Sequence, residues 1–139
     1  MHIRPFLPAD QSAVIALWTT CGIVRPWNDP VKDIARKLTV QPELFLVGEL
    51  DNEIVAVGMF GFDGTRGWVH YLAVEPSRQG ESLGRALMAE GEELLKQLGC
   101  PKVNLQVRSG NERVIGFYES LGYVADGTVT LGKRIIPDV

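Results

Sequence analysis

The segment LAVEPSRQGESLGRAL, residues 72–87, guides the interpretation of the whole chain. It joins a β-rich run ending at Val74 to a helical apolar stripe beginning at Leu83, through a turn that contains Gly80 and precedes Gly84. Unpaired amides and the positive end of a helix dipole make such a turn an anion site, and a diphosphate is a natural occupant. Glycine-containing turns between strand and helix are also common as purely structural connections. The turn alone therefore leaves both interpretations open.

The spacing in this turn does not fit two common phosphate-binding loops. A Walker loop needs Gly-Lys-Ser or Gly-Lys-Thr before the helix, and here Arg78 and Arg85 carry the positive charge without a lysine. A dinucleotide fingerprint needs G-x-G-x-x-G after an early strand of a crossover unit. The strands expected before this turn are joined by hairpins instead, which argues against both loops.

The residues before the segment predict a short strand, two helices and three antiparallel strands. Asp10 stands at the cap position of a first helix whose face includes Trp18 and which ends at Gly22. Asp29 followed by Pro30 is a cap and first-turn signal for the second helix. Short turns separate the β-rich runs, which makes neighbouring strands antiparallel. The predicted strands are His2–Phe6, Leu44–Leu50, Ile54–Phe62 and Trp68–Val74.

The residues after the segment predict a helix, a strand, a second helix and two final strands. The first helix ends at Gly99, and the second is capped by Asn111 and ends at Gly122. There is no internal repeat, linker or low-complexity tract, so residues 1–139 are expected to form one domain. The predicted strands are Val103–Val107, Tyr123–Val129 and Leu131–Ile136.

Composition narrows the classes of function. The chain has 139 residues, 45% of them hydrophobic, and a net charge of -3 without a basic run, which argues against a nucleic-acid partner. Cys21 and Cys100 are far apart and belong to no metal-ligand pattern, so we expect reduced thiols, no zinc and no disulfide framework. We find no secretory leader and no apolar run long enough for a membrane span. These features predict a cytoplasmic protein without a membrane partner.

Two separated motifs give the sequence a family resemblance. Gln79-Gly80-Glu81-Ser82-Leu83-Gly84 resembles the acetyl-CoA signature Q/R-x-x-G-x-G/A of the GNAT (Gcn5-related N-acetyltransferase) family, and the preceding strand ends in the expected L-x-V-x-P. Asn111 and FYESLGY, residues 117–123, resemble the downstream half of the same pattern. Residues 23–30 and 131–134 look like those of the YpeA-type bacterial acetyltransferases. The resemblance covers essentially the full chain, and two spaced motifs are much harder to match by accident than one.

The resemblance implies a fold and a reaction. The fold is α/β (α+β), with a mixed, mostly antiparallel central sheet of about six to seven strands and about four helices, splayed between strands four and five. The reaction is an acetyl-CoA-dependent N-acetyl transfer to a primary amine, by direct attack in a ternary complex and without a metal. Residues implied in binding acetyl-CoA are Leu72, Ala73, Val74, Arg78, Gln79, Gly80, Glu81, Ser82, Leu83, Gly84, Arg85 and Asn111.

The family analogy also implies how the cofactor is held. The strand Trp68–Val74 bends at a bulge and parts from Val103–Val107, so that backbone groups near Leu72 and Val74 pair with the pantetheine arm as an added strand. An amide near Leu72 then points at the thioester oxygen. As structure alone, the side chains of Leu72 and Val74 are core residues.

One position departs from the motif. Ser82 replaces the middle glycine, where a Cβ either crowds the diphosphate or demands a different backbone angle. Alternatively, its hydroxyl donates to a phosphate oxygen or caps the helix. Glu81 adds negative charge beside the proposed anion. We expect binding to persist, more weakly than in the family at large.

Tyr118 is the candidate general acid, because a phenol can protonate the leaving thiolate, although an aromatic residue beside Phe117 also suits simple packing. The proton acceptor is left open among His70, Tyr71, Glu75 and water. The acceptor pocket is expected to include Arg25, Trp27, Asn28 and His70, with the alternative that Trp27 only plugs the helix pair.

The sequence leaves the acceptor open between a small-molecule and a peptide amine, and it leaves open a homodimer. Its main rival prediction is a catalytically silent module that binds or senses acyl-CoA, supported by Ser82 and the unassigned base. A second rival is an interaction domain without a cofactor.

Overall fold

The computed structural model describes residues 1–138. The chain divides into two compact units, one of residues 1–105 together with Asp138, the other of residues 106–137. The first unit carries the sheet and three helices, and the second carries one helix. Each unit is described in turn.

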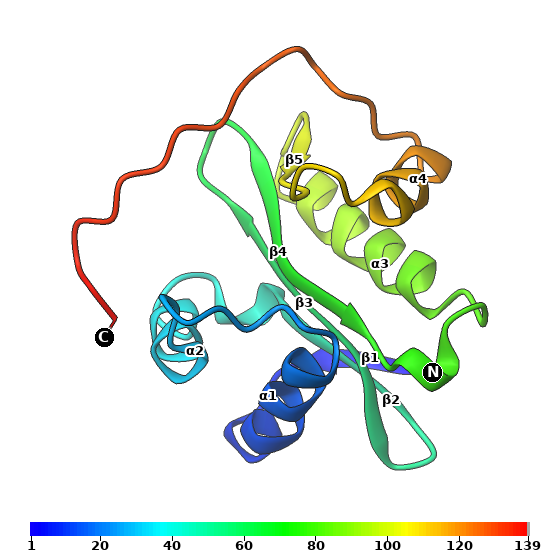
Figure 1. Ribbon diagram of the computed structural model, residues 1–139. Helices are drawn as coiled ribbons and strands as arrows, with labels where there is room; N and C mark the ends of the chain where they lie inside the picture. The colour runs from blue at the N-terminus through cyan, green and yellow to red at the C-terminus, as the bar shows by residue number, and fades with distance from the viewer. Residues whose placement is uncertain (139) are drawn as a thin grey trace. The chain divides into compact units, whose positions relative to one another are not determined.

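The first unit contains a sheet with the strand order β1-β2-β3-β4-β5, which is the one sheet of residues 1–138 (Figure 1). The first four strands form antiparallel neighbours in chain order, and β5 lies parallel to β4. Short hairpin connections explain the antiparallel part, whereas the parallel pair is joined through a helix. The strands are β1 (His2–Pro5), β2 (Phe45–Leu50), β3 (Glu53–Phe62), β4 (Gly67–Val74) and β5 (Val103–Leu105).

The helices of the first unit cover both faces of the sheet. Helices α1 (Gln11–Thr20) and α2 (Pro30–Lys37) lie on one face, and α3 (Leu83–Gln97) lies on the other (Figure 1). The carboxylate of Asp29 accepts a hydrogen bond from Val31 N at 2.9 Å, which confirms the predicted cap of α2. Asp10 precedes α1 as predicted, but its side chain makes no bond to that helix; it accepts from Leu7 N at 2.8 Å instead.

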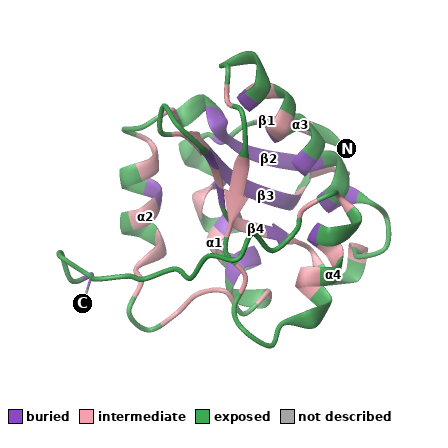
Figure 2. Ribbon diagram, turned by 90° about the horizontal axis from the view of Figure 1, so that it is seen from above, coloured by how far each residue is buried: buried purple, intermediate pink, exposed green. Residues whose placement is uncertain are grey.

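A column of aromatic rings fills the core beneath α1 and α2. Phe6 stacks on Phe45 with ring centroids 4.3 Å apart, and Trp18 lies parallel to Phe45 and then meets Tyr71 at 4.2 Å. Trp18 and Phe45 are fully buried. Figure 2 shows the buried residues concentrated along β2 and β3, the central strands of the sheet. This column ties the first helix to strands β2 and β4 by apolar burial.

The opposite face packs α3 against the sheet at a glycine. A Cβ at Gly91 would lie 2.2 Å from Cε1 of Phe60, which is fully buried on β3. Gly91 therefore lets the helix backbone approach the aromatic ring. β4 ends at Val74 and α3 begins at Leu83, and the phosphate-binding turn is expected between them.

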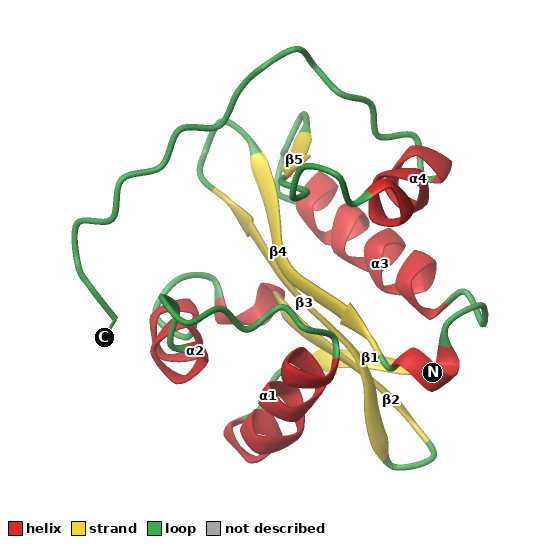
Figure 3. Cartoon of the chain, in the orientation of Figure 1, coloured by secondary structure: helices red, strands yellow, loops and turns green. Residues whose placement is uncertain are grey.

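The second unit contains α4 (Glu112–Ser120), followed by residues without helix or strand (Figure 3). The predicted strands Tyr123–Val129 and Leu131–Ile136 are therefore wrong, and the sheet of residues 1–138 has five strands instead of about six to seven. Val129, Leu131 and Ile135 are all more than four-fifths exposed. Alternating apolar residues favour a strand only when another strand completes the ladder, and no described strand pairs with this segment. The predicted strand Val103–Val107 is also shorter and ends at Leu105.

We predict that Gly91→Ala destabilises the protein. The new methyl group would meet the Phe60 ring, and overpacking of this kind costs about 1–3 kcal/mol, more than the gain in helix propensity. Gly116→Ala is the matched control, because Gly116 lies inside α4 and a Cβ there meets nothing within 4 Å. The control should gain up to about 1 kcal/mol in the free energy of unfolding measured in urea. Equal stability of the two variants would contradict the packing described for α3.

Candidate active site

Strand β4 bends at a β-bulge centred on Tyr71. The register with β3 shifts between the pairs Val57↔Ala73 and Met59↔His70, so Tyr71 and Leu72 together face Gly58. Tyr71 has φ +59°, in the left-handed region where a bulge usually has glycine. A side chain in that conformation costs about 1–2 kcal/mol, so neighbouring residues must hold it there.

Two neighbours hold the bulge. The indole N–H of Trp18 donates to the carbonyl of Tyr71 at 3.0 Å, and the two rings pack face to face with a tilt of 33°. The phenol of Tyr71 donates to Oδ2 of Asp33, in α2, at 2.5 Å. Both helices on this face therefore fix the same residue of β4. The N–H and C=O of one trans peptide point in opposite directions, so the Trp18 bond aims the N–H of Leu72 away from Trp18.

The bulge leaves part of β4 with an open edge. Pairing with β5 covers Gly67–Val69, and no strand of residues 1–138 pairs with the rest of β4 on that side. Glu75 N donates to Val55 O at 2.8 Å, so alternation directs the carbonyl of Leu72 and the amide of Val74 away from β3. The carbonyl of Val74 accepts from the Cys21 thiol at 3.4 Å. The predicted bulge is confirmed, and the pairing of β4 with β5 stops at Val69. An extended ligand could pair with the open edge of β4.

The predicted phosphate-binding turn runs from the 3₁₀ turn Pro76–Arg78 to the start of α3. Gly80 has φ +93° and Ser82, the residue before the helix, has φ +62°. The side chain of Ser82 makes no capping bond, so the predicted alternative of a hydroxyl cap is wrong. The backbone of Ser82 has the left-handed conformation that favours glycine. The N-terminal amides of this long helix and its dipole can attract an anion at this turn.

The charges around the turn are mixed. Arg78 pairs with Asp51 of the β2–β3 hairpin at 3.1 Å and with Glu81 at 3.6 Å. Gln79, Glu81 and Arg85 are exposed. Acidic residues therefore compete with any phosphate for the guanidinium of Arg78.

His70 lies on the same sheet face as α1 and α2, together with Trp68. The bulge puts Tyr71 on that face too and turns Leu72 to the α3 face. The rings of His70 and Trp68 stack at 6.1 Å. His70 is exposed as a residue, yet the surrounding protein atoms partly desolvate its ring, and together with the nearby Lys37 this lowers its pKa. A neutral imidazole at pH 7 can accept a proton.

The loop between α1 and α2 contains the other predicted acceptor residues. Asn28 N donates to the carbonyl of Arg25 at 3.0 Å, which closes a turn around Trp27. Trp27 is 50% exposed, so about half of its surface is open to solvent. It presents an aromatic surface to solvent beside Arg25.

Tyr118 and Asn111 belong to the second unit. Tyr118 is 8% exposed and makes edge-on contacts with Phe117 and Tyr123. Burial raises the pKa of Tyr118 to about 12, so the phenol is protonated at neutral pH. Asn111 is at the predicted cap position of α4, but its side chain makes no capping bond.

Trp18 and Asp33 are site residues that the sequence analysis did not identify. Trp18 was placed on a helix face, and Asp33 stands in the second helix without any motif around it. Their contacts with Tyr71 join residues 53 and 38 positions apart in the chain. No local signal predicts such partners, because the bulge itself determines where the carbonyl and the phenol of Tyr71 point.

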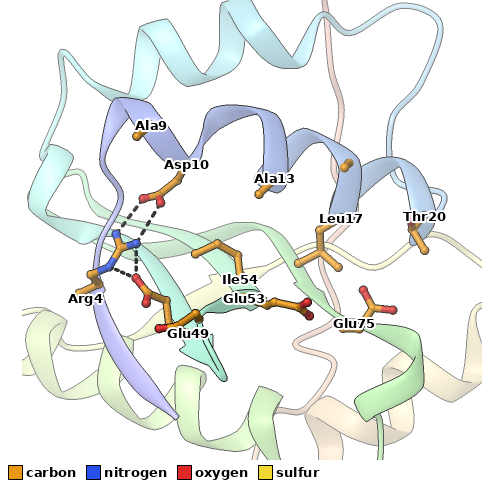
Figure 4. A pocket seen from close by; sticks show the side chains of 12 residues that line it. Arg4, Ala9, Asp10, Ala13, Leu17, Thr20, Glu49, Glu53, Ile54 and Glu75 are labelled. Carbon is orange, nitrogen blue, oxygen red and sulfur yellow. Dashed lines mark hydrogen bonds and ion pairs between the residues drawn. The ribbon is translucent and has the colours of Figure 1, made fainter.

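A separate pocket of about 560 Å³ lies beneath α1 (Figure 4). Arg4 fills one end and binds Asp10 through two hydrogen bonds of 2.7 and 2.9 Å and Glu49 through a further ion pair. The bonds from Arg4 lower the pKa of Asp10. Glu75, one of the candidate proton acceptors, also lines this pocket. Its carboxylate therefore faces α1 and the β2–β3 hairpin.

Two further observations concern residues 1–138 as a whole. None of their helices combines the length and apolar character needed to cross a bilayer. Within the same range, no group of three or more His, Cys, Asp or Glu side chains is arranged to hold a metal ion. Cys21 and Cys100 are free thiols.

We predict that Ser82→Gly stabilises the protein by about 0.5–1 kcal/mol. Glycine removes the cost of a side chain at φ +62°, and part of this gain is offset by the greater freedom of glycine in the unfolded chain. Ser77→Gly is the control, since Ser77 lies in the same turn without a positive φ and should lose stability. Thermal unfolding measures both. A loss in Ser82→Gly as large as that in the control would contradict the left-handed geometry.

Comparison with known proteins agrees with the fold. The family model for the acetyltransferase (GNAT) family matches residues 12–123. An acetyltransferase of Pectobacterium atrosepticum is 49% identical over 99% of this chain and 98% of its own length. The structure of Ard1 from Thermoplasma volcanium has a TM-score of 0.77 at 25% identity, covering 88% of this chain and 82% of that chain.

A second solved structure, AAC(6')-Iy in complex with the bisubstrate analogue CoA-S-monomethyl-acetylneamine, has a TM-score of 0.79 at 12% identity and covers 97% of this chain and 98% of that chain. At that identity the likeness concerns the fold. The family model and the Pectobacterium relative establish more, because each matches most of the sequence. The chain belongs to the GNAT family of acetyltransferases.

Proposed function

We propose that this acetyltransferase uses acetyl-CoA and transfers the acetyl group to a primary amine by direct attack in a ternary complex. The observation that carries the proposal is the open edge of β4 beyond the bulge at Tyr71, followed directly by the turn into α3. An extended arm with amide groups fits the first feature, and a diphosphate fits the second. The AAC(6')-Iy structure, which was solved with a CoA-linked analogue, adds support from the fold.

The chain's own groups define how acetyl-CoA would be held. The carbonyl of Leu72 and the amide of Val74 would pair with the pantetheine arm, with Ala73 between them bonded to β3. The turn would bind the diphosphate through its backbone amides, with help from the arginines at its rim. The proposed turn residues are Arg78, Gln79, Gly80, Glu81, Ser82, Leu83, Gly84 and Arg85, and Asn111 is proposed as a further contact.

Two features argue for moderate cofactor affinity. Arg78 is engaged by Asp51 and Glu81, and the Cβ of Ser82 occupies the place of a motif glycine. The acidic partners of Arg78 lower the positive potential at the turn, and the Cβ of Ser82 reduces the space available to a diphosphate. The same features support the rival proposal of a silent acyl-CoA-binding module, which the assay below separates from a transferase.

Acetyl-CoA supplies an activated thioester whose acetyl group passes to nitrogen. In the proposed reaction a C–N bond forms as the C–S bond breaks, the amine loses a proton and the sulfur gains one. The N–H of Leu72 would donate to the carbonyl oxygen, where negative charge grows. Tyr118 would give its proton to the sulfur, since its high pKa keeps the phenol protonated. His70, with its lowered pKa, would accept the proton from the amine, directly or through water.

The proposed acceptor pocket combines the α1–α2 loop with the α2 side of β4. Arg25, Trp27 and Asn28 would contact the body of the acceptor, and His70 would face its amine. An exposed indole and a guanidinium suit a flat or anionic group next to the amine. We propose a small-molecule or peptide amine as acceptor, and a cytoplasmic site of action without nucleic acid or membrane as partner. We also propose that residues 1–139 form one domain, because the match to the family model includes residues of both units. A homodimer is the assembly that we would test first.

The decisive assay incubates the protein with acetyl-CoA and a panel of amines that includes polyamines, amino acids, aminoglycosides and peptides with free N-termini. We expect acetylated product detected by mass spectrometry, which avoids interference from the free thiols of Cys21 and Cys100. Thermal stabilisation by acetyl-CoA without product across the panel would favour the silent binding module. No stabilisation by any acyl-CoA would contradict cofactor binding itself.

We predict that Tyr118→Phe lowers kcat by about 10²-fold or more, the size of a typical general-acid contribution, with KM for acetyl-CoA nearly unchanged. The phenol would act only as the C–S bond breaks, so its loss should spare binding. Phe117→Leu is a control that changes a neighbouring ring of the same aromatic cluster without removing a proton donor. If Tyr118→Phe retained wild-type kcat, Tyr118 would have no part in the mechanism.

A further inference from the structure

We propose that Asp138, Arg36 and Asp33 form a positioning chain that sets the bulge of β4 and thereby the amide of Leu72. The inference rests on the proposed function of that amide. The three residues are not among those proposed to bind acetyl-CoA or to line the acceptor loop. Their link to the site is Tyr71, whose phenol binds Asp33. They are therefore positioning residues.

The chain is a continuous series of short polar contacts within the first unit. Oδ1 of Asp138 accepts from Nη2 of Arg36 at 2.6 Å, and Nη1 of Arg36 donates to Oδ1 of Asp33 at 2.9 Å. The other oxygen of Asp33 accepts from the phenol of Tyr71 at 2.5 Å. Asp33 thus uses one oxygen for Arg36 and the other for Tyr71, so the guanidinium fixes the direction in which the second oxygen points.

Asp138 is built into the structure, although it is the last residue but one. Its side chain is fully buried, and its Oδ2 accepts from Asp29 N at 2.8 Å. Its carbonyl accepts from Nζ of Lys32 at 2.6 Å. A buried carboxylate is retained only when partners replace its water, and here the partners come from both ends of α2. Asp138 therefore helps to fix the position of Arg36 on α2.

The positioning chain ends at Tyr71, a strained residue whose position matters for the proposed reaction. Tyr71 keeps φ +59° because Trp18 holds its carbonyl and Asp33 holds its phenol. A loss of the Asp33 contact removes one of the two supports, so the Trp18 bond alone must hold the Tyr71–Leu72 peptide against the strain and the peptide gains freedom to shift. A displaced donor weakens the support for a developing charge much more than it weakens ground-state binding.

The kinetic test compares Tyr71→Phe and Asp138→Asn with Asp10→Asn. Tyr71→Phe removes the hydrogen bond to Asp33, and Asp138→Asn removes the ion pair with Arg36. The control removes a different ion pair of the same unit, that of Asp10 with Arg4. We expect about a tenfold fall in kcat for both chain variants, with KM for acetyl-CoA changed less than about twofold. The control should lose a similar amount of thermal stability and keep its kcat. Equal kcat in all three variants would overturn the proposal.

A second readout needs neither cofactor nor activity. In ¹⁵N-labelled protein without ligand, the amide resonances of Leu72 and Ala73 should shift in Tyr71→Phe and in Asp138→Asn, and should stay in place in Asp10→Asn. Unshifted resonances in Asp138→Asn would overturn the chain even if the enzyme were active. If the wild-type protein acetylated no amine, the proposed function would fail, and these shifts would still decide whether Asp138 influences the bulge.

Discussion

The hydrogen bond from the Trp18 indole to the carbonyl of Tyr71 is the contact on which the site depends. It is made by a fully buried side chain, and it holds a tyrosine in the left-handed conformation in the middle of a strand. Without that conformation β4 would continue straight, and its outer edge could pair with β5 along its length. The bulge instead ends the pairing at Val69 and leaves the following backbone groups open. Burial of the aromatic column thus maintains a defect in the sheet that the proposed cofactor would fill.

Two non-glycine residues with positive φ lie near the two ends of the proposed cofactor segment. Tyr71 has φ +59° where the open edge begins, and Ser82 has φ +62° where α3 begins. Strain of this kind persists where surrounding contacts over-determine the backbone, and it gathers at functional sites. Tyr71 has such contacts in Trp18 and Asp33, whereas Ser82 makes no capping bond. The turn at Ser82 is therefore the less supported end, which fits moderate affinity better than a loss of the site.

Much of the first unit could be predicted from local sequence. Turn residues at Asp51 and Asn52, both with positive φ, mark the β2–β3 hairpin, and Asp29 caps α2 as its type and position indicate. The two final strands could not be predicted correctly. Their alternating apolar residues carry the local preference, but pairing depends on a partner strand that the described residues do not provide. Strand formation at Val129 and Leu131 is a tertiary property.

The candidate site divides in the same way. The glycine turn follows from a motif, and the open strand edge is implied by the family resemblance, so both could be located by residue number before the structure was known. The contacts of Trp18, Asp33 and Asp138 join distant parts of the chain through atoms whose directions are set by the fold. No spacing rule predicts them. They are also the contacts that turn a generic open edge into one with a fixed amide.

The most direct measurement of the central claim is hydrogen exchange at the amide of Val74 with and without acetyl-CoA. This amide faces away from β3 and has no strand beside it among residues 1–138. If the pantetheine arm completes the sheet, exchange at Val74 should slow on addition of acetyl-CoA far more than exchange at Ala73, which is already bonded to β3. Protection at the turn around Gly80 with unchanged exchange at Val74 would contradict the account.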